Sequence, residues 1–184
     1  MKIVLLDRPV TYDGLQLATA FVDEHGGGED DVGVLFEGEA DVPVAHLVDL
    51  EDRDAGAFIY SPWMAHVILE HRGMDLRSGV FAQRLLMRLM SDWISRRAGV
   101  ALDVRGDDLY LEERKLSVSV ATASPRGVLV HAAVNVRADG APVPALGLSD
   151  LRLNARDFLS AIGRCYADEL ESVAHAMAKV KGVS

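Results

Sequence analysis

The chain has 184 residues, of which 19 are lysine or arginine and 28 are aspartate or glutamate, so its formal net charge is −9. This acidity excludes broad, non-specific binding of nucleic acid, which depends on lysine and arginine against phosphate. An apolar fraction of 49% and a charged fraction of 26% are typical of globular proteins and exclude a disordered chain. At about 100–200 residues per domain, we expect residues 1–184 to form a single domain.

The cysteine content and the apolar runs indicate the compartment. Cys165 is the only cysteine in the sequence, so we expect no internal disulfide and a reducing environment. Residues 2–7 are too short for the apolar core of a signal peptide. The longest charge-free apolar region, residues 55–69, is interrupted by Ser61-Pro62 and His66, which is not typical of a membrane span. The sequence therefore predicts a cytoplasmic protein without a membrane partner.

The N-terminal quarter predicts short strands and one helix. Strands are expected at residues 3–6 and 32–37, and a further strand within residues 42–50. A helix is expected at residues 15–22, after the turn Tyr12-Asp13-Gly14.

A second helix is expected from Ser61-Pro62, with the serine as N-cap and the proline at the first helical position. On that helix His66 and Glu70 would share one face. A zinc site needs a third protein ligand, which the sequence does not locate, so we expect no metal.

Two long helices and four strands are predicted in the rest of the chain. One helix is expected from about Ser78 to Arg97, and another from Asn154, with Asp157 three residues on. Between them the apolar period changes to two, which indicates an antiparallel meander of strands at residues 100–104, 109–111, 116–122 and 128–136. Because strands and helices are segregated, the fold class is α+β.

The last two strands form the most informative segment. In both strands the valines occupy even-numbered positions. Burying them all on one side of the sheet requires even-numbered residues of one strand to pair with even-numbered residues of the other, which needs a loop with an odd number of residues. Pro125-Arg126-Gly127 supplies three, with glycine last. This interpretation places Ser117 opposite Asn135, and it expects the two long helices to cover the face of Val118, Val130 and Val134.

The opposite face would then carry small and polar side chains, namely those of Lys115, Ser117, Ser119, His131 and Asn135. Such a face can be the floor of a ligand site, where a lysine ammonium suits a carboxylate or phosphate. The alternative is that a helix covers it through close packing of serine and alanine, or that it faces water.

The same segment resembles the biotin and lipoate protein ligases. The resemblance rests on two motifs, residues 107–117 (Asp-Asp-Leu-Tyr-Leu-Glu-Glu-Arg-Lys-Leu-Ser) and residues 131–136 (His-Ala-Ala-Val-Asn-Val). Blocks like Tyr12-Asp13-Gly14 and residues 48–52, 105–108 and 114–122 resemble ones that recur in a family named domain of unknown function 366, to which the chain is more similar over its whole length. The resemblance implies a mixed, mainly antiparallel sheet flanked by helices, the fold that these ligases share with class II aminoacyl-tRNA synthetases. It also implies that the essential lysine of the ligases corresponds to Lys115.

Two features of those enzymes are missing from this sequence. The glycine- and arginine-rich loop that holds the acyl-adenylate phosphate has no counterpart, because Gly26-Gly27-Gly28 is followed by three acidic residues. Octanoyltransferases carry a cysteine nucleophile after the Asn-Val strand, whereas residues 137–150 contain none. Acyl transfer through a cysteine thioester is therefore not expected.

We consider three functions. The first is a ligase- or transferase-like enzyme that binds a small carboxylic acid or its adenylate, with Lys115 as the catalytic residue and ATP as the one cofactor to consider. The second is a non-catalytic module that binds a small molecule, and the third is a structural or interaction protein. The expected partners are a small-molecule ligand and a second copy in a homodimer, and the expected ligand-binding residues are Arg105, Asp107, Asp108, Ser117, Ser119, His131 and Asn135.

Overall fold

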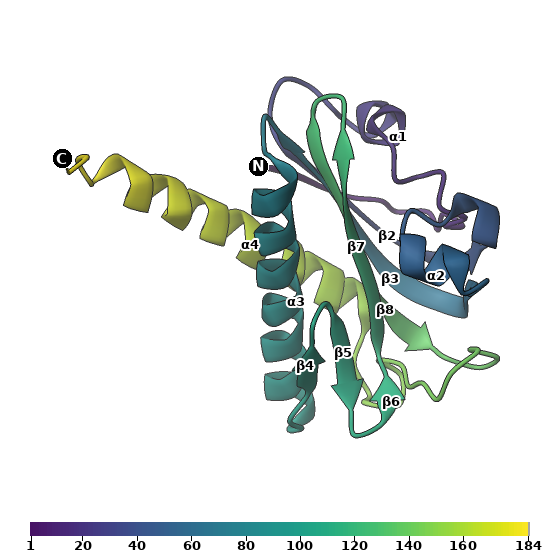
Figure 1. Ribbon diagram of the computed structural model, residues 1–184. Helices are drawn as coiled ribbons and strands as arrows, with labels where there is room; N and C mark the ends of the chain where they lie inside the picture. The colour runs from purple at the N-terminus through teal and green to yellow at the C-terminus, as the bar shows by residue number, and fades with distance from the viewer. Residues whose placement is uncertain (184) are drawn as a thin grey trace.

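A five-stranded sheet lies at the centre of the computed structural model, which describes residues 1–183 (Figure 1). The strand order is β1-β2-β3-β8-β7. The pair β1–β2 is parallel and the other three pairs are antiparallel. The predicted α+β class, with a mixed and mainly antiparallel sheet flanked by helices, is confirmed. The strands are β1 (Lys2–Leu5), β2 (Val32–Val42), β3 (Ile59–Arg72), β7 (Ser117–Ser124) and β8 (Gly127–Arg137).

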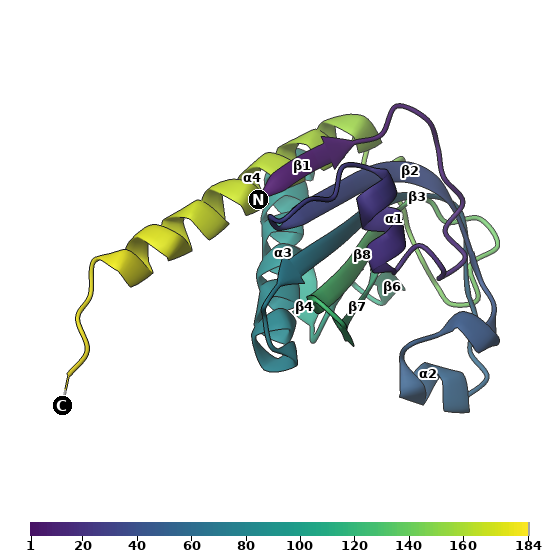
Figure 2. The same ribbon diagram turned by 90° about the horizontal axis from the view of Figure 1, so that it is seen from above.

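Both long helices pack on the same face of this sheet. The helices α3 (Leu76–Ala98) and α4 (Ala155–Ala178) lie on one side, and the short helices α1 (Thr19–Glu24) and α2 (Leu50–Asp54) lie on the other (Figures 1 and 2). The core beneath the long helices is built from their apolar faces and from the strands, and includes Leu86, Met90, Ile94, Phe158 and Ile162 with Leu35, Val67, Leu69, Val130 and Val134.

The helix α4 begins where the sequence predicts, with Asn154 as its N-cap, whereas α3 begins two residues before the expected start at Ser78, with Asp75 as its N-cap. The side chain of Asp75 accepts a hydrogen bond from the Ser78 amide, and that of Asn154 accepts one from the Asp157 amide. The second half of α4 extends away from the body of the molecule (Figure 1). Within residues 1–183, no helix combines the length and the apolar composition that crossing a bilayer requires.

The helix expected from Ser61-Pro62 is wrong, because this segment is the central strand β3. Residues 64–71 of β3 are all buried, so both faces of this stretch are covered and its apolar residues do not alternate with exposed ones. Pro62 falls where the register shifts against both neighbouring strands, and its missing N–H is tolerated at such a bulge.

Two shorter predictions in the N-terminal part also change. The strand expected within residues 42–50 is instead a 3₁₀ turn, Val44–His46, followed by α2, which Asp49 caps through the amides of Glu51 and Asp52. The first helix begins at Thr19 rather than at residue 15. The strand predicted at residues 32–37 is confirmed and extends to Val42 as β2.

The predicted register of the β7–β8 hairpin is wrong by one residue. Ser124 pairs with Gly127, so the loop is Pro125-Arg126 alone, and Ser117 lies opposite Val134 rather than Asn135. A Cβ on Gly127, whose φ is +149°, would lie 2.1 Å from the carbonyl oxygen of His71 on β3, so only glycine fits there.

The valines of β7 and β8 therefore lie on opposite faces of the sheet. Val130 and Val134 pack under α3 and α4, whereas Val118 faces the other side, beside Met64 and Ala133. The prediction that the long helices cover all three valines is correct for Val130 and Val134 and wrong for Val118.

The expected four-strand meander divides between two sheets. Three short strands, β4 (Asp103–Arg105), β5 (Asp108–Leu111) and β6 (Arg114–Lys115), form a separate sheet in the order β4-β5-β6. Leu116 connects this small sheet directly to β7, so the two sheets meet at Lys115.

The hairpin tip is fastened to the sheet by a buried carboxylate. Glu70 on β3 is fully buried, and Arg126 donates to both of its oxygens at 3.1 and 3.0 Å. Arg126 also donates to both oxygens of Asp23 in α1 at 3.0 Å. This arginine thus connects α1, β3 and the β7–β8 turn.

We expect Arg126→Ala to lower the melting temperature clearly, because it leaves the buried Glu70 carboxylate without its bidentate partner. Thermal unfolding followed by circular dichroism measures this effect. The control is Arg53→Ala, which removes an ion pair with Asp54 between two well-exposed side chains and should leave the melting temperature unchanged. Equal melting temperatures of the two variants would contradict the role given to Arg126.

Candidate functional site

A cavity of about 560 Å³ opens on the sheet face opposite α3 and α4. Met64 on β3, Val118 and Val120 on β7, and His131 and Asn135 on β8 line its floor. Its walls come from the segment around α2, from the β5–β6 hairpin and from residues 141–145. A volume of this size is typical of sites for small organic molecules.

Lys115 lies in the wall where the two sheets meet. Its amide donates to Pro144 O, and its carbonyl accepts from the Leu146 amide, so its backbone is held on the side of the 141–145 loop. Its Nζ lies 2.8 Å from the Asp108 carboxylate. This ion pair joins Lys115 to Asp108, one of the two neighbouring aspartates that the sequence places among the ligand-binding residues.

The surroundings shift both groups of this ion pair. Burial raises the pKa of Asp108, and this effect outweighs the hydrogen bond and the charge of Lys115, which act in the opposite direction. Burial alone would lower the pKa of Lys115, but the hydrogen bond and charge of Asp108, with smaller contributions from Tyr110 and Asp52, raise it overall. Lys115 therefore stays charged, and Asp108 is the member of the pair that takes up a proton more readily.

The two serines do not offer free hydroxyls to the cavity, although both residues contribute to its wall. The Ser117 hydroxyl accepts from the Leu109 amide at 2.8 Å. The Ser119 hydroxyl accepts from Gln83 on α3 and donates to the Asp107 carbonyl, both at 2.8 Å. With the corrected register, these side chains fasten β7 to the small sheet and to α3, which corrects their expected role as a polar floor.

The remaining predicted residues are divided between the cavity and the surface. Asp107 lines the cavity, and its carboxylate accepts from Gln83 at 3.0 Å and lies 3.6 Å from Arg84. Asn135 lines the floor, and its Nδ2 donates to Leu146 O at 3.2 Å. Arg105 lies outside the cavity, where it pairs with Asp103 and Glu113 and lies over the Tyr110 ring.

Two aromatic residues that sequence reasoning does not assign to the site contact His131, namely Tyr12, which lines the cavity, and His66, which lies outside the lining. The Tyr12 and His131 rings stack at 3.9 Å between centroids, and His66 Nδ1 lies 3.2 Å from His131 Nε2. The sequence pattern indicates only a turn at Tyr12 and a helix at His66, so neither residue is expected beside His131. Within residues 1–183, no third metal-ligating side chain joins the two histidines.

Burial keeps the aromatic cluster of Tyr12, His66 and His131 uncharged. Burial lowers the pKa of His66 to about 3, although its hydrogen bond to Gly38 O opposes the shift. Burial, with a contribution from His66, also lowers the pKa of His131 well below its usual value. Burial raises the pKa of Tyr12, so its hydroxyl stays protonated. All three rings are neutral at neutral pH.

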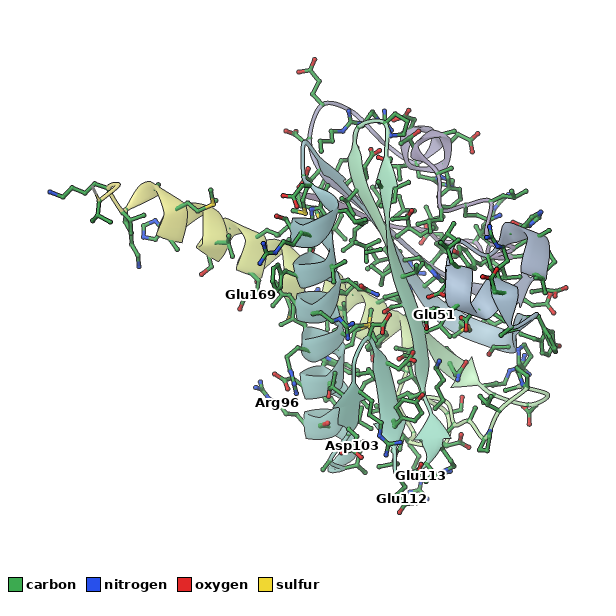
Figure 3. All side chains as sticks on the ribbon, viewed as in Figure 1. Glu51, Arg96, Asp103, Glu112, Glu113 and Glu169 are labelled. Atoms are coloured by element: carbon green, nitrogen blue, oxygen red, sulfur yellow. The ribbon has the colours of Figure 1, made fainter. Side chains whose placement is uncertain are left out.

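The cavity is acidic around its rim. In the part of the chain that the structure describes, Lys115 is the only lysine or arginine that lines it. Glu113 lies at the tip of the β5–β6 hairpin, beside Glu112 (Figure 3). The carboxylates in the lining are those of Asp49, Asp52, Asp107, Asp108 and Glu113. This excess of negative charge opposes the binding of a polyanion.

The fold is that of the biotin and lipoate protein ligases. Biotin protein ligase from Aquifex aeolicus, solved as a single-residue mutant in complex with biotin, aligns at a TM-score of 0.61 and 12% identity over 93% of this chain and 70% of that one. Protein Ta0514 from T. acidophilum, solved with bound lipoic acid, aligns at a TM-score of 0.62 and 14% identity over 92% and 86% of the two chains.

The chain belongs to the family described as domain of unknown function DUF366, whose model matches residues 1–181. A solved protein of unknown function from Pyrococcus horikoshi has a TM-score of 0.92 and 30% identity, with full coverage of both chains. The expected family and its ligase-like fold are thereby confirmed.

The buried histidines predict a specific response to acid. The pKa values of His66 and His131 are lowered in the folded state, so their contribution to stability is complete above the unfolded pKa of about 6.5 and is lost as the pH falls below it. Each should remove up to about 1.4 kcal/mol of unfolding free energy per pH unit in that range. Urea unfolding between pH 7 and 5 measures the slope.

A double variant, His66→Phe with His131→Leu, should flatten this slope. The matched control is His175→Gln, at an exposed histidine of α4, which should leave the slope as in the wild type. An unchanged slope in the double variant would show that the two histidines are not held neutral in the folded protein.

Proposed function

We propose that this protein binds a small carboxylic acid in the cavity and that Lys115 contacts the ligand carboxylate. The observation that carries the proposal is the position of Lys115, the single lysine or arginine that lines the cavity within residues 1–183. Its side chain is about a quarter exposed, and its ammonium is held at 2.8 Å from Asp108. A desolvated ammonium makes a charge-assisted hydrogen bond to a carboxylate, which is stronger than one between neutral groups.

The rest of the cavity suits the apolar body of such a ligand. Val118, Val120 and Met64 supply an apolar stretch of floor between Lys115 and His131. Mostly apolar walls with a few fixed polar groups are typical of small-molecule sites. The two ligase-fold structures above were solved with biotin and with lipoic acid, both of which are carboxylic acids with an apolar chain next to the carboxyl group. This likeness of fold supports the class of ligand and gives no role to any residue.

Asp108 makes the binding of an anion dependent on pH. A ligand carboxylate beside Lys115 also approaches the Asp108 carboxylate, and two neighbouring carboxylates favour one shared proton. The pKa of Asp108 is already raised by burial, so the uptake of this proton is favoured further when the ligand binds. We therefore expect binding of the carboxylate to be coupled to the uptake of one proton.

The residues that line the cavity do not fit ATP. A triphosphate needs several cationic side chains or a glycine-rich loop of backbone amides, whereas this lining carries five carboxylates and one lysine. The acidic rim therefore favours the non-catalytic binding module over the adenylating ligase, and we propose no adenylation step. A pyrophosphate-exchange assay with each candidate acid tests this choice, and exchange above background would support the enzyme instead.

Undecanoate, a straight-chain carboxylic acid, serves as the probe of this site. Lys115→Met should bind it at least about tenfold more weakly than the wild type, because the substitution removes a charge-assisted contact of about 1.5–3 kcal/mol. Its melting temperature should stay close to the wild-type value, since Asp108 can become protonated when its partner is lost. Isothermal titration calorimetry measures the affinity. Arg114→Met is the matched control, because Arg114 is the exposed neighbour and lies outside the cavity lining. Wild-type affinity in Lys115→Met would contradict the proposal.

Asp108→Asn should have the opposite effect and bind undecanoate more tightly than the wild type at pH 8. It removes a negative charge next to the ligand and replaces it with an amide that can donate a hydrogen bond. In the wild type, affinity should fall by up to about tenfold per pH unit above the pKa of Asp108, since one proton is taken up on binding. The variant should lose this dependence between pH 6.5 and 8.5. A wild-type affinity that is constant over this range would show that Asp108 takes up no proton.

A further inference from the structure

The second end of the cavity is defined by a chain of hydrogen bonds through two buried histidines. His66 Nε2 lies 3.3 Å from Gly38 O on β2, and His66 Nδ1 lies 3.2 Å from His131 Nε2. His66 is fully buried, and His131 is 3% exposed. Phe36 stacks on the His66 ring and Tyr12 stacks on the His131 ring, so aromatic neighbours fix both rings.

These contacts determine which nitrogen of each ring carries the proton. The carbonyl of Gly38 can only accept, so His66 Nε2 must be the donor. A neutral imidazole has one donor and one acceptor, and His66 Nδ1 is therefore an acceptor. His131 Nε2 must then donate to it. By the same rule, His131 Nδ1 is left as an acceptor.

This last acceptor is open to the cavity. His131 Nδ1 has no hydrogen-bond partner among residues 1–183. In that range, Arg72 Nε is the single side-chain nitrogen or oxygen that is both fully buried and without a partner. His131 Nδ1 is therefore in contact with open space. His131 lines the cavity floor. A ligand group placed against this wall therefore meets a fixed lone pair, and leaving that lone pair unpaired beneath an apolar group is unfavourable.

We propose that this end of the cavity selects ligands that carry an uncharged N–H or O–H donor at the end opposite their carboxylate, and that His131 Nδ1 accepts the hydrogen bond. The inference rests on the proposed function, because Lys115 sets the carboxylate end. Asn135 Nδ2 lies 3.5 Å from the backbone carbonyl of Lys115. His131 lies four residues from Asn135 along β8, so the backbones of these two residues are about 13 Å apart. The two ends together specify an elongated carboxylic acid. A cationic donor is excluded by the desolvation that keeps the neighbouring rings neutral.

Four ligands separate this inference from the proposed function. Two are acids, 10-hydroxydecanoate and undecanoate, which differ in that a methyl group replaces the hydroxyl in undecanoate. The other two are the methyl esters of these acids. Calorimetry on the wild type should find the hydroxy acid bound at least about fivefold more tightly than undecanoate, with the same preference between the esters. Equal affinity of hydroxyl and methyl compounds would overturn the inference. Equal affinity of acids and esters would contradict the proposed function while leaving the hydroxyl comparison intact, and no saturable binding of any of the four would contradict both.

Two variants test the residue assignment. His131→Leu should abolish the preference for the hydroxyl. His25→Leu is the control, because His25 lies outside the cavity lining and its Nδ1 donates to Phe21 O at 2.9 Å, so its loss should keep the preference. Retention of the preference in His131→Leu, or its loss in His25→Leu, would overturn the assignment to His131.

The tautomers can be observed in the wild-type protein without any ligand. Long-range ¹H–¹⁵N NMR spectra distinguish protonated from unprotonated ring nitrogens. At pH 7.5 both Nε2 atoms of His66 and His131 should be protonated and both Nδ1 atoms unprotonated. A proton on His131 Nδ1 would overturn the inference even if His131→Leu failed to fold.

Discussion

The placement of α3 and α4 on one face of the five-stranded sheet is the constraint on which the site depends. Because these helices bury one row of side chains on β3, β7 and β8, the other row of the same strands is left for the cavity floor. The short α1 covers part of that second face, together with Phe36, Ile68 and Leu129. The cavity forms over the region around Met64 and Val118, between α2 and the β5–β6 hairpin.

The part of the site that is local in sequence was predictable. Lys115 and Asp108 are separated by a short hairpin, and the segment that carries them has turn signals and alternating apolar residues that predict this arrangement. The long helices were also predictable, since each has an amphipathic period and a capping residue at its start. Such signals come from residues near one another along the chain, where the geometry of one element determines the contact.

The hairpin register could not be predicted from the pattern of valines. That prediction holds only if β7 and β8 bury their valines on one side. In the structure β8 lies between β3 and β7 with both faces buried, so hydrophobicity does not distinguish its faces. What fixes the register is non-local, namely the close approach of Gly127 to the β3 backbone and the contact of Arg126 with the buried Glu70. The same double burial made β3 resemble a helix.

The buried aromatic cluster was missed for a related reason. Tyr12, His66 and His131 are far apart in the sequence, and the order of strands across the sheet brings them together. No spacing along the chain signals such a contact. The cluster is also what gives the cavity its polarity, because it supplies neutral groups at one end while Lys115 and Asp108 supply an ion pair at the other.

The central claim is that this cavity holds a small carboxylic acid against Lys115. The most direct measurement is an NMR titration of the full chain with decanoate, followed through backbone amide resonances. We expect saturable shifts at Lys115, Val118, Val120 and the 141–145 loop, and little change along α3 and the exposed half of α4. Saturable shifts confined to other surfaces, or the absence of saturable shifts around Lys115, would contradict the claim.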